Sequence, residues 1–178
     1  MIEHSAATPD PQVRYALEWT EKLLQDRELP FRIRLEYDAS VGTDGVFRLQ
    51  KQDELVTISG DAEGLRCGLY TLLHAMGFRW FNPGEPVIGP AGEIRPDWEN
   101  LTGVRRPDFK YRGLHICGPK DHFDEKVAAW MSFNRMNRKL TSFREIEAVG
   151  DRLDRFGIRA DTTVHAYAAL VPDHKYFA

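Results

Sequence analysis

Histidine and cysteine are the residue types in this chain whose spacing most directly tests for metal chemistry. Cys67 and Cys117 lie far apart and belong to no Cys-x-x-Cys pair. The histidines with a possible ligand role fall on separate expected elements, without the short ligand pairs of zinc sites. They are His115, His122, His165 and His174. We therefore expect no metal and no cofactor, with the histidines solvated or hydrogen-bonded and both cysteines buried as free thiols.

Other motifs for catalysis or phosphate binding are missing from the sequence. It contains no Gly-x-Ser-x-Gly elbow and no phosphate-binding loop. Gly60, Gly64 and Gly68 are spaced by four residues, which suits packing along a helix and lacks the tight Gly-x-Gly turn of a dinucleotide site. Three charged residues between an expected strand and helix could line a sugar site or form a solvated loop. They are Lys120, Asp121 and Asp124.

The first part of the chain alternates helical and strand patterns. A helix is expected over 12–26, with Asp10 as its cap and Pro11 in its first turn. Alternating apolar and charged residues over 31–37 predict a strand, and further strands over 46–50 and 54–59 would complete a three-stranded meander. A weaker candidate strand lies within 1–8.

A second helix follows the expected meander. An apolar stripe from Leu65 to Met76 predicts it, and Gly77 should end it in a left-handed conformation. The aromatic segment 78–81 predicts another strand. From 86 to 107, glycine and proline indicate a linker that carries one or two short strands.

The remainder reads as strand, helix, strand, helix, strand, which is the start of a parallel α/β array. Strands are expected over 109–116, 139–143 and 158–165, and helices over 123–136 and from Ile146 to Phe156. Asn137 is expected to cap the first of these helices. No internal repeat or low-complexity segment is visible.

Two segments carry a resemblance to a known group of enzymes. The run S-G-D-A-E-G-L-R-C-G-L-Y-T-L-L-H-A-M-G-F-R-W-F-N-P-G, with the strands before it, resembles the amino-terminal domain of family-20 β-hexosaminidases and family-67 α-glucuronidases. The run R-R-P-D-F-K-Y-R-G-L resembles the entry into the first strand of their catalytic barrel. N-R-M-N and V-H-A-Y-A-A-L-V-P-D-H-K-Y-F are closer to uncharacterised bacterial relatives.

The resemblance implies a glycoside hydrolase that works with two carboxylates at the carboxyl ends of barrel strands. Arg112 matches an arginine that holds sugar hydroxyls in hexosaminidases, a task that suits the fork of donors on a guanidinium; a salt bridge is the alternative. His165 ends an apolar strand where barrel sites are built, and His115 ends the first barrel strand. Arg112, His115 and His165 are therefore the expected substrate-binding residues, and the catalytic residues are unknown.

The expected fold class is α/β. Residues 10–105 would form a hexosaminidase domain 2-like accessory domain, with a mostly antiparallel sheet and two helices, plus linker. Residues 106–178 would form the first units of a partial parallel β/α barrel. Because the relatives carry their key carboxylates on the fourth and later strands, the chain is expected to be a fragment that is inactive alone.

Composition limits the partners. A net charge of −3 and a pI near 6.1 do not suggest a nucleic-acid-binding face. No segment resembles a membrane span or a signal peptide, so we expect no membrane partner and a cytoplasmic protein, or a secreted one if a leader was removed. Carbohydrate is the expected substrate. The alternative is a short non-catalytic sugar-binding or interaction module that self-associates, with a homodimer favoured because its barrel strands would have open edges.

Overall fold

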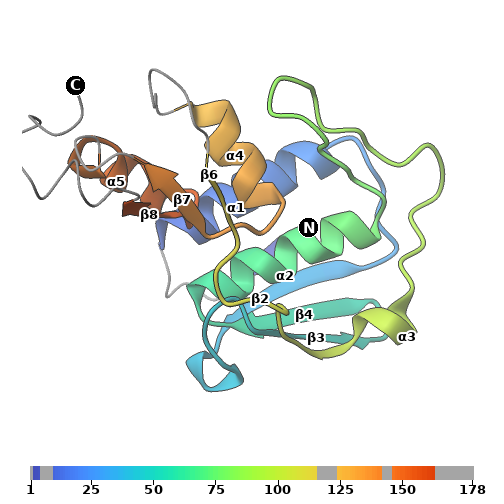
Figure 1. Ribbon diagram of the computed structural model, residues 1–178. Coiled ribbons are helices and arrows are strands. Elements are labelled where there is room, and N and C mark those ends of the chain that lie inside the picture. Colours follow the sequence, from blue (N-terminus) through green and yellow to red (C-terminus); the bar gives the residue numbers. More distant parts are fainter. Residues whose placement is uncertain (1, 5–9, 116–123, 142–145, 163–178) are drawn as a thin grey trace, which may run out of the picture.

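The computed structural model describes residues 2–4, 10–115, 124–141 and 146–162, and these form two sheets with helices packed between and beside them (Figure 1). The first sheet has five strands and the second has three. Both helical and strand elements are present in each part of the chain, which confirms the α/β class. Among the described residues, no helix combines the length and the apolar character needed to cross a membrane.

The five-stranded sheet is mixed, and its strand order is β1-β2-β4-β3-β5. Its strands are β1 (Ile2–His4), β2 (Arg32–Tyr37), β3 (Phe47–Gln52), β4 (Leu55–Gly60) and β5 (Gly103–Arg105). The candidate strand at the amino terminus is confirmed as β1. The pairs β1/β2 and β2/β4 are parallel, whereas β3/β4 and β3/β5 are antiparallel.

The predicted meander is therefore wrong, and so is the mostly antiparallel sheet. Alternating patterns identified all three strands but not their order. Strand β4 has a nearly continuous buried run through Ser59 and Gly60, whereas β3 is exposed from Gln50 to Gln52. The more apolar strand takes the central place, where six-residue strands pair with both of its edges, whereas the outer edges of β2 and β3 are paired over three residues only.

Two helices cover one face of this sheet (Figure 1). Helix α1 (Pro11–Leu24) begins at the predicted Asp10 cap, whose carboxylate accepts from the Gln12 amide at 3.0 Å. Helix α2 (Ala62–Ala75) begins at Asp61 and ends before Gly77, which has the predicted left-handed φ of 96°. A short 3₁₀ helix, η1 (Ala39–Val41), follows β2.

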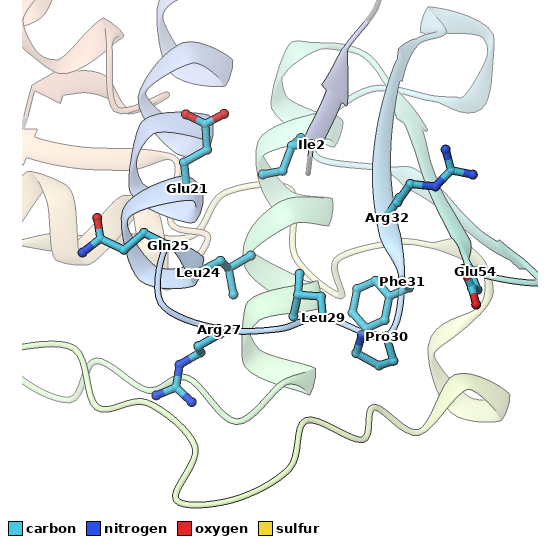
Figure 2. A pocket seen from close by; sticks show the side chains of 10 residues that line it. All are labelled: Ile2, Glu21, Leu24, Gln25, Arg27, Leu29, Pro30, Phe31, Arg32 and Glu54. Atoms are coloured by element: carbon cyan, nitrogen blue, oxygen red, sulfur yellow. The ribbon is translucent and has the colours of Figure 1, made fainter.

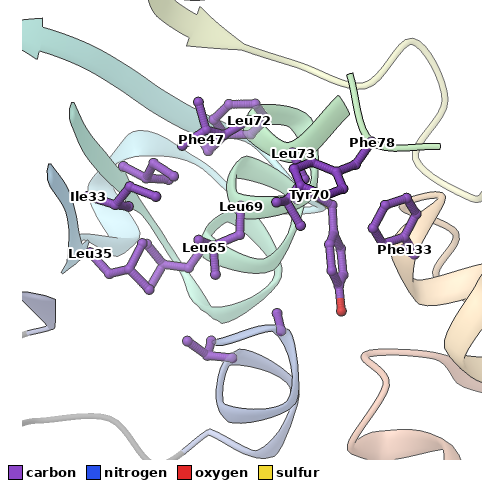
Figure 3. Packing of buried hydrophobic residues seen from close by; sticks show 14 of the residues in the cluster. Ile33, Leu35, Phe47, Leu65, Leu69, Tyr70, Leu72, Leu73, Phe78 and Phe133 are labelled. Carbon is purple, nitrogen blue, oxygen red and sulfur yellow. The ribbon is translucent and has the colours of Figure 1, made fainter. Parts of the chain in front are cut away.

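Glycines allow α2 to lie close to the strands, as the four-residue spacing predicted. A Cβ atom on Gly64 would lie 2.2 Å from the Val46 carbonyl oxygen, and one on Gly68 would lie 2.4 Å from Cγ2 of Ile58. Leucines of α2 then pack against Ile33, Leu35 and Phe47 of the strands, while Tyr70 points away from the sheet toward Phe133 (Figure 3). The core is thus continuous from the first sheet to the helices of the second.

The aromatic segment 78–81 is not a strand. It forms a single antiparallel bridge between Arg79 and Ile88. Phe78 and Trp80 are buried, whereas Phe81 is 65% exposed, so the alternation reflects packing against the core without strand pairing. The segment predicted as a linker contains the short helix α3 (Trp98–Leu101), which was not predicted, and the expected short strand β5.

The second sheet is parallel, in the order β6-β7-β8, as predicted. We call it, with its two helices, the parallel array. It contains β6 (Gly113–His115), α4 (Glu125–Phe133), β7 (Arg138–Thr141), α5 (Ile146–Asp154) and β8 (Arg159–Thr162). Gly157, with φ of 67°, separates α5 from the last strand. The division of the chain into domains at about residue 105 stays a prediction.

Candidate functional site

The carboxyl ends of β6, β7 and β8 lie along one edge because the three strands are parallel (Figure 1). This is the edge where the sequence predicts a sugar site. His115 closes β6, and its backbone is in register with Leu140. His165, Lys120 and Asp121 lie outside the described residues. Sugar binding by His115 and His165 therefore stays a prediction.

Arg112 lies at the other end of β6, where its guanidinium makes several protein contacts. Nη2 lies 2.9 Å from Oε1 of Glu63 in α2. Nε donates to the Arg135 carbonyl at 2.8 Å, and Nη1 donates to the Phe109 carbonyl at 2.6 Å. These contacts are of the type that the salt-bridge alternative predicts for Arg112. A sugar-binding role for Arg112, which stays a prediction, would have to operate alongside them.

Asn137 joins the same set of contacts. Its Nδ2 donates to Oε1 of Glu63 and to the Lys110 carbonyl, each at 2.8 Å, and its Oδ1 accepts from the Arg112 amide at 2.9 Å. The predicted helix-capping role is wrong, because α4 ends at Asn134 and the buried Asn137 side chain ties β6 to α2. We call Glu63, Arg112 and Asn137 the junction cluster.

Arg66 is a second polar link and is fully buried. Its Nε donates to Oε1 of Gln12 at 3.2 Å, in α1. Nη1 donates to the Ser132 carbonyl at 3.1 Å and Nη2 to the Gly157 carbonyl at 3.3 Å. One rigid guanidinium therefore satisfies acceptors from three separate segments, which a lysine ammonium could not match in geometry.

Aromatic side chains complete the contact between α4 and the first part of the chain. Nε1 of Trp130 donates to the Trp80 carbonyl at 2.9 Å. His74 packs edge-on against Phe133, with ring centroids 4.9 Å apart. Burial lowers the pKa of His74 to about 4, and the nearby charges of Arg135 and Arg79 act in the same direction. The imidazole is therefore neutral near pH 7.

A cavity of about 530 Å³ lies beside the junction cluster, at the amino-terminal ends of β7 and β8. Its lining includes Asp44, Asp61, Glu63, Asp154 and Arg159. Burial raises the pKa of the Asp61 carboxyl, with smaller contributions from Glu63, Asp44 and Asp10. Asp61 also caps α2 through the Gly64 amide at 2.7 Å. In β/α barrels, residues at the amino-terminal ends of the strands contribute to stability, and the active site lies at the carboxyl ends.

A larger cavity of about 650 Å³ opens between the end of α1 and the start of β2 (Figure 2). Figure 2 shows Leu24, Leu29 and Phe31 on its apolar side and Glu21 and Arg32 at its margins. Its two carboxylates, those of Glu21 and Glu54, lie on opposite sides of the cavity (Figure 2). It therefore offers no arrangement for the two-carboxylate chemistry that the sequence predicts.

Metal chemistry receives no support from the described part of the chain, where no three His, Cys, Asp or Glu side chains gather in a way that could hold an ion. Cys67 is a buried free thiol, as predicted, and burial raises its pKa. Cys117 lies outside the described residues.

Sequence reasoning missed Glu63, Arg66 and Arg135 as key polar residues. Glu63 looks like an ordinary acidic residue in the first turn of a helix. The usable signal was the segment from Gly64 to Tyr70, where apolar residues and glycines surround Arg66 on every side of the helix. A helix with apolar residues all round is buried, so its single arginine had to find buried partners.

No protein-family profile and no curated protein matches the sequence. Solved structures do match the fold. The β-N-acetylhexosaminidase of Bacteroides fragilis aligns with a TM-score of 0.59 and 16% identity over 96% of this chain and 42% of its own. The GH20 exo-β-N-acetylglucosaminidase of Vibrio harveyi, in complex with N-acetylglucosamine, has a TM-score of 0.59 and 12% identity over 92% of this chain and 32% of its own.

A third match comes from another enzyme family. A GH138 enzyme that targets pectin rhamnogalacturonan II has a TM-score of 0.54 and 12% identity, over 88% of this chain and 30% of its own. The chain therefore spans only about a third to two fifths of the proteins that it matches. At these identities the likeness concerns the fold, and the fold of this chain is related to that of glycoside hydrolases.

Proposed function

We propose that this chain is the amino-terminal portion of a carbohydrate-active glycoside hydrolase. The observation that supports the proposal is the combination of two sheets. A mixed sheet with α1 and α2 is joined through the junction cluster to a parallel array whose strand ends are aligned. More than nine tenths of the chain aligns with GH20 enzymes in that arrangement.

In this proposal the first unit, residues 10–105, is an accessory domain that supports the start of a barrel at 106–178. The substrate is a glycoside, and the strand edge that begins with His115 contributes to its binding. Hydrolysis needs two carboxylates beside the glycosidic bond, and we expect these on later strands. The isolated 178-residue chain should then fold without turning over substrate.

The first experiment is an intact-mass measurement of the protein purified from its source. A mass far above the 20.5 kDa of this chain is the expected result. The second is a turnover assay of the 178-residue chain with p-nitrophenyl N-acetyl-β-glucosaminide and p-nitrophenyl α-glucuronide. We expect no release of nitrophenol above a heat-denatured control. A native mass of 20.5 kDa, or turnover by this chain, would each overturn the proposal.

The alternative is a non-catalytic module that self-associates, and a specific observation favours it. Within the described residues, β6 and β8 each have one unpaired edge. In the segment that leads into β6, Phe109 is 73% exposed and Tyr111 is 61% exposed. Unpaired edges with exposed aromatic side chains favour association. Dimers in sedimentation that dissociate in a Phe109→Ser, Tyr111→Ser variant would support this alternative, and a monomer without binding of an apolar dye would exclude it.

A further inference from the structure

A third cavity, of about 310 Å³, lies where the segment before β6 crosses α2. It differs in charge from the two cavities described above, because four arginines line it with a single carboxylate, that of Asp108. The arginines are Arg105, Arg106, Arg112 and Arg135. Since all four precede β6 or β7, the cavity lies away from the strand ends where a sugar site is predicted. We call it the arginine pocket.

The arginine pocket holds more positive than negative charge, because its four guanidinium groups have two carboxylates near them, that of Asp108 in the lining and that of Glu63 on Arg112. Arg112 is paired with Glu63, whereas Arg105 donates only to the backbone carbonyls of Leu101 and Thr102. Arg106 and Arg135 form no ion pair with any carboxylate in the described ranges. Arg135 is partly buried, whereas Arg106 is exposed. Partly buried charge without a partner is costly, so an anion beside Arg135 would be bound favourably.

The backbone of Arg135, which lines the pocket, has a strained conformation. Its φ is 61°, in the left-handed region, and it follows the Asn134 cap of α4. The Met136 amide donates to the Met131 carbonyl at 2.9 Å, which is the helix-ending motif that favours glycine at this position. A non-glycine residue there carries about 1 kcal/mol of strain. The arginine side chain that replaces the favoured glycine donates to Oγ1 of Thr71 at 3.1 Å.

The environment of Arg135 agrees with an unfilled anion site. Burial lowers the pKa of its guanidinium, and the neighbouring charges of Arg112 and Arg79 lower it further. Only one of its donors has a partner within the described part of the chain, although a guanidinium carries five N–H groups in a fixed fork. The remaining donors suit two oxygens of one carboxylate or phosphate group.

The rest of the lining indicates how large the ligand is. Phe47, Pro107 and Phe109 form apolar walls, and the volume is at the lower end for small-molecule pockets. Such a space holds a group the size of one sugar ring. We propose that the arginine pocket binds a monosaccharide that carries a carboxylate or phosphate group, with Arg106 and Arg135 holding the oxyanion. This inference does not depend on the proposed hydrolase function.

Titration calorimetry at constant ionic strength tests the proposal with glucuronate, glucose 6-phosphate, inorganic phosphate and glucose. Glucuronate or glucose 6-phosphate should bind, and glucose should not. If inorganic phosphate binds as tightly as glucose 6-phosphate, the sugar part of the proposal is wrong. If none of the anions binds, the whole proposal is wrong.

Two variants locate the binding. Arg106→Gln removes an exposed side chain, and Arg135→Gly replaces a strained residue with the one that its backbone favours, so both should fold. Each should weaken binding at least tenfold. Arg95→Gln is the matched control, because Arg95 is exposed and, among the described residues, forms an ion pair only with Glu93, outside the pocket. An equal loss in the control, or unchanged binding in both pocket variants, would overturn the assignment.

Discussion

The five-stranded sheet and the parallel array differ in how far each is stabilised by contacts within its own region. Strands β2, β3 and β4 are six residues long and pack directly on α2, whereas β6, β7 and β8 have three or four residues each. The array is attached through Arg66, the junction cluster and the aromatic contacts of α4. Helix α2 serves both regions, since its leucines face the first sheet and Tyr70 faces Phe133 of the array.

In this chain the second face of α2 combines aromatic packing on Phe133 with polar contacts of fixed geometry. An apolar face alone would pack against many partners with similar energy. The hydrogen bonds that Arg66 donates and Glu63 accepts are satisfied in one arrangement. The first sheet should therefore tolerate changes at the contact, and the array should not.

The largest effect is expected from Arg66→Met, which keeps an unbranched apolar stem and removes the guanidinium. The carbonyls of Ser132 and Gly157 would lose a buried donor, so we expect a loss of about 3–5 kcal/mol in the free energy of unfolding. Urea denaturation followed by circular dichroism measures it. Arg66→Lys should recover little of the loss, because an ammonium cannot span the same acceptors.

A matched control is Arg32→Met. Arg32 is an exposed arginine that pairs with Glu3 at 3.2 Å, and its loss should cost at most about 1 kcal/mol. If Arg66→Met is no more destabilising than Arg32→Met, the array is held by apolar packing alone and the comparison of the two regions fails.

The next effect is a dependence of stability on pH through His74. Its pKa is about 4 when folded and 6.5 in a model peptide, so the unfolded chain binds more protons between these values. Stability should therefore fall as pH decreases from about 6.5 to 4, by up to about 3 kcal/mol. The experiment compares the free energy of unfolding of the wild type and His74→Leu at pH 7.5, 6.5, 5.5 and 4.5.

In His74→Leu the contribution of this histidine to the pH dependence should be absent. The difference in stability between wild type and variant should then change steadily across the window and be constant above pH 7.5. A difference that is the same at every pH would show that His74 titrates equally in both states. It would also show that its contact with Phe133 does not make the junction pH-sensitive.

The smallest effects come from alanine at one glycine in each region, and they should have opposite signs. In Gly64→Ala the new Cβ would lie 2.2 Å from the Val46 carbonyl, so α2 must move from the sheet at a cost of about 1–3 kcal/mol. In Gly150→Ala, in α5, no atom of the described residues lies within 4 Å of the new Cβ. That variant should gain about 0.5–1 kcal/mol from helix propensity. Thermal unfolding of both variants checks the signs, and a loss in both would mean that α5 is packed more tightly than described.

Sequence patterns predicted most elements but not their order or their contacts. Asp10 and Gly77 mark helix ends by local chemistry, and the spacing of Gly64 and Gly68 indicated the close packing of α2. The order of β2, β3 and β4 could not be read from alternation, because a period of two records which side of a strand is buried and not which strand lies beside it. Strand prediction failed at 78–81 for the same reason.

The candidate site was predictable only as a location. Parallel strand ends must share an edge, so that edge followed from the strand-helix pattern, and a sugar site there stays a prediction. The partners of Arg112 did not follow from that pattern, because Glu63, Arg135 and Asn137 lie at least 23 residues away along the chain. Local composition carries no information about such contacts.

The sequence by itself determined the α/β class, the Asp10 and Gly77 helix ends, the buried free thiol of Cys67 and the parallel array. These depend on periodicity, on turn residues and on burial, which act over a few neighbouring positions. Only the tertiary structure decided that β4 is central, that Arg66 and the junction cluster join the two sheets, and that four arginines line one pocket. Those features depend on contacts between polar side chains that are far apart in the sequence. Such contacts form only in the packed molecule.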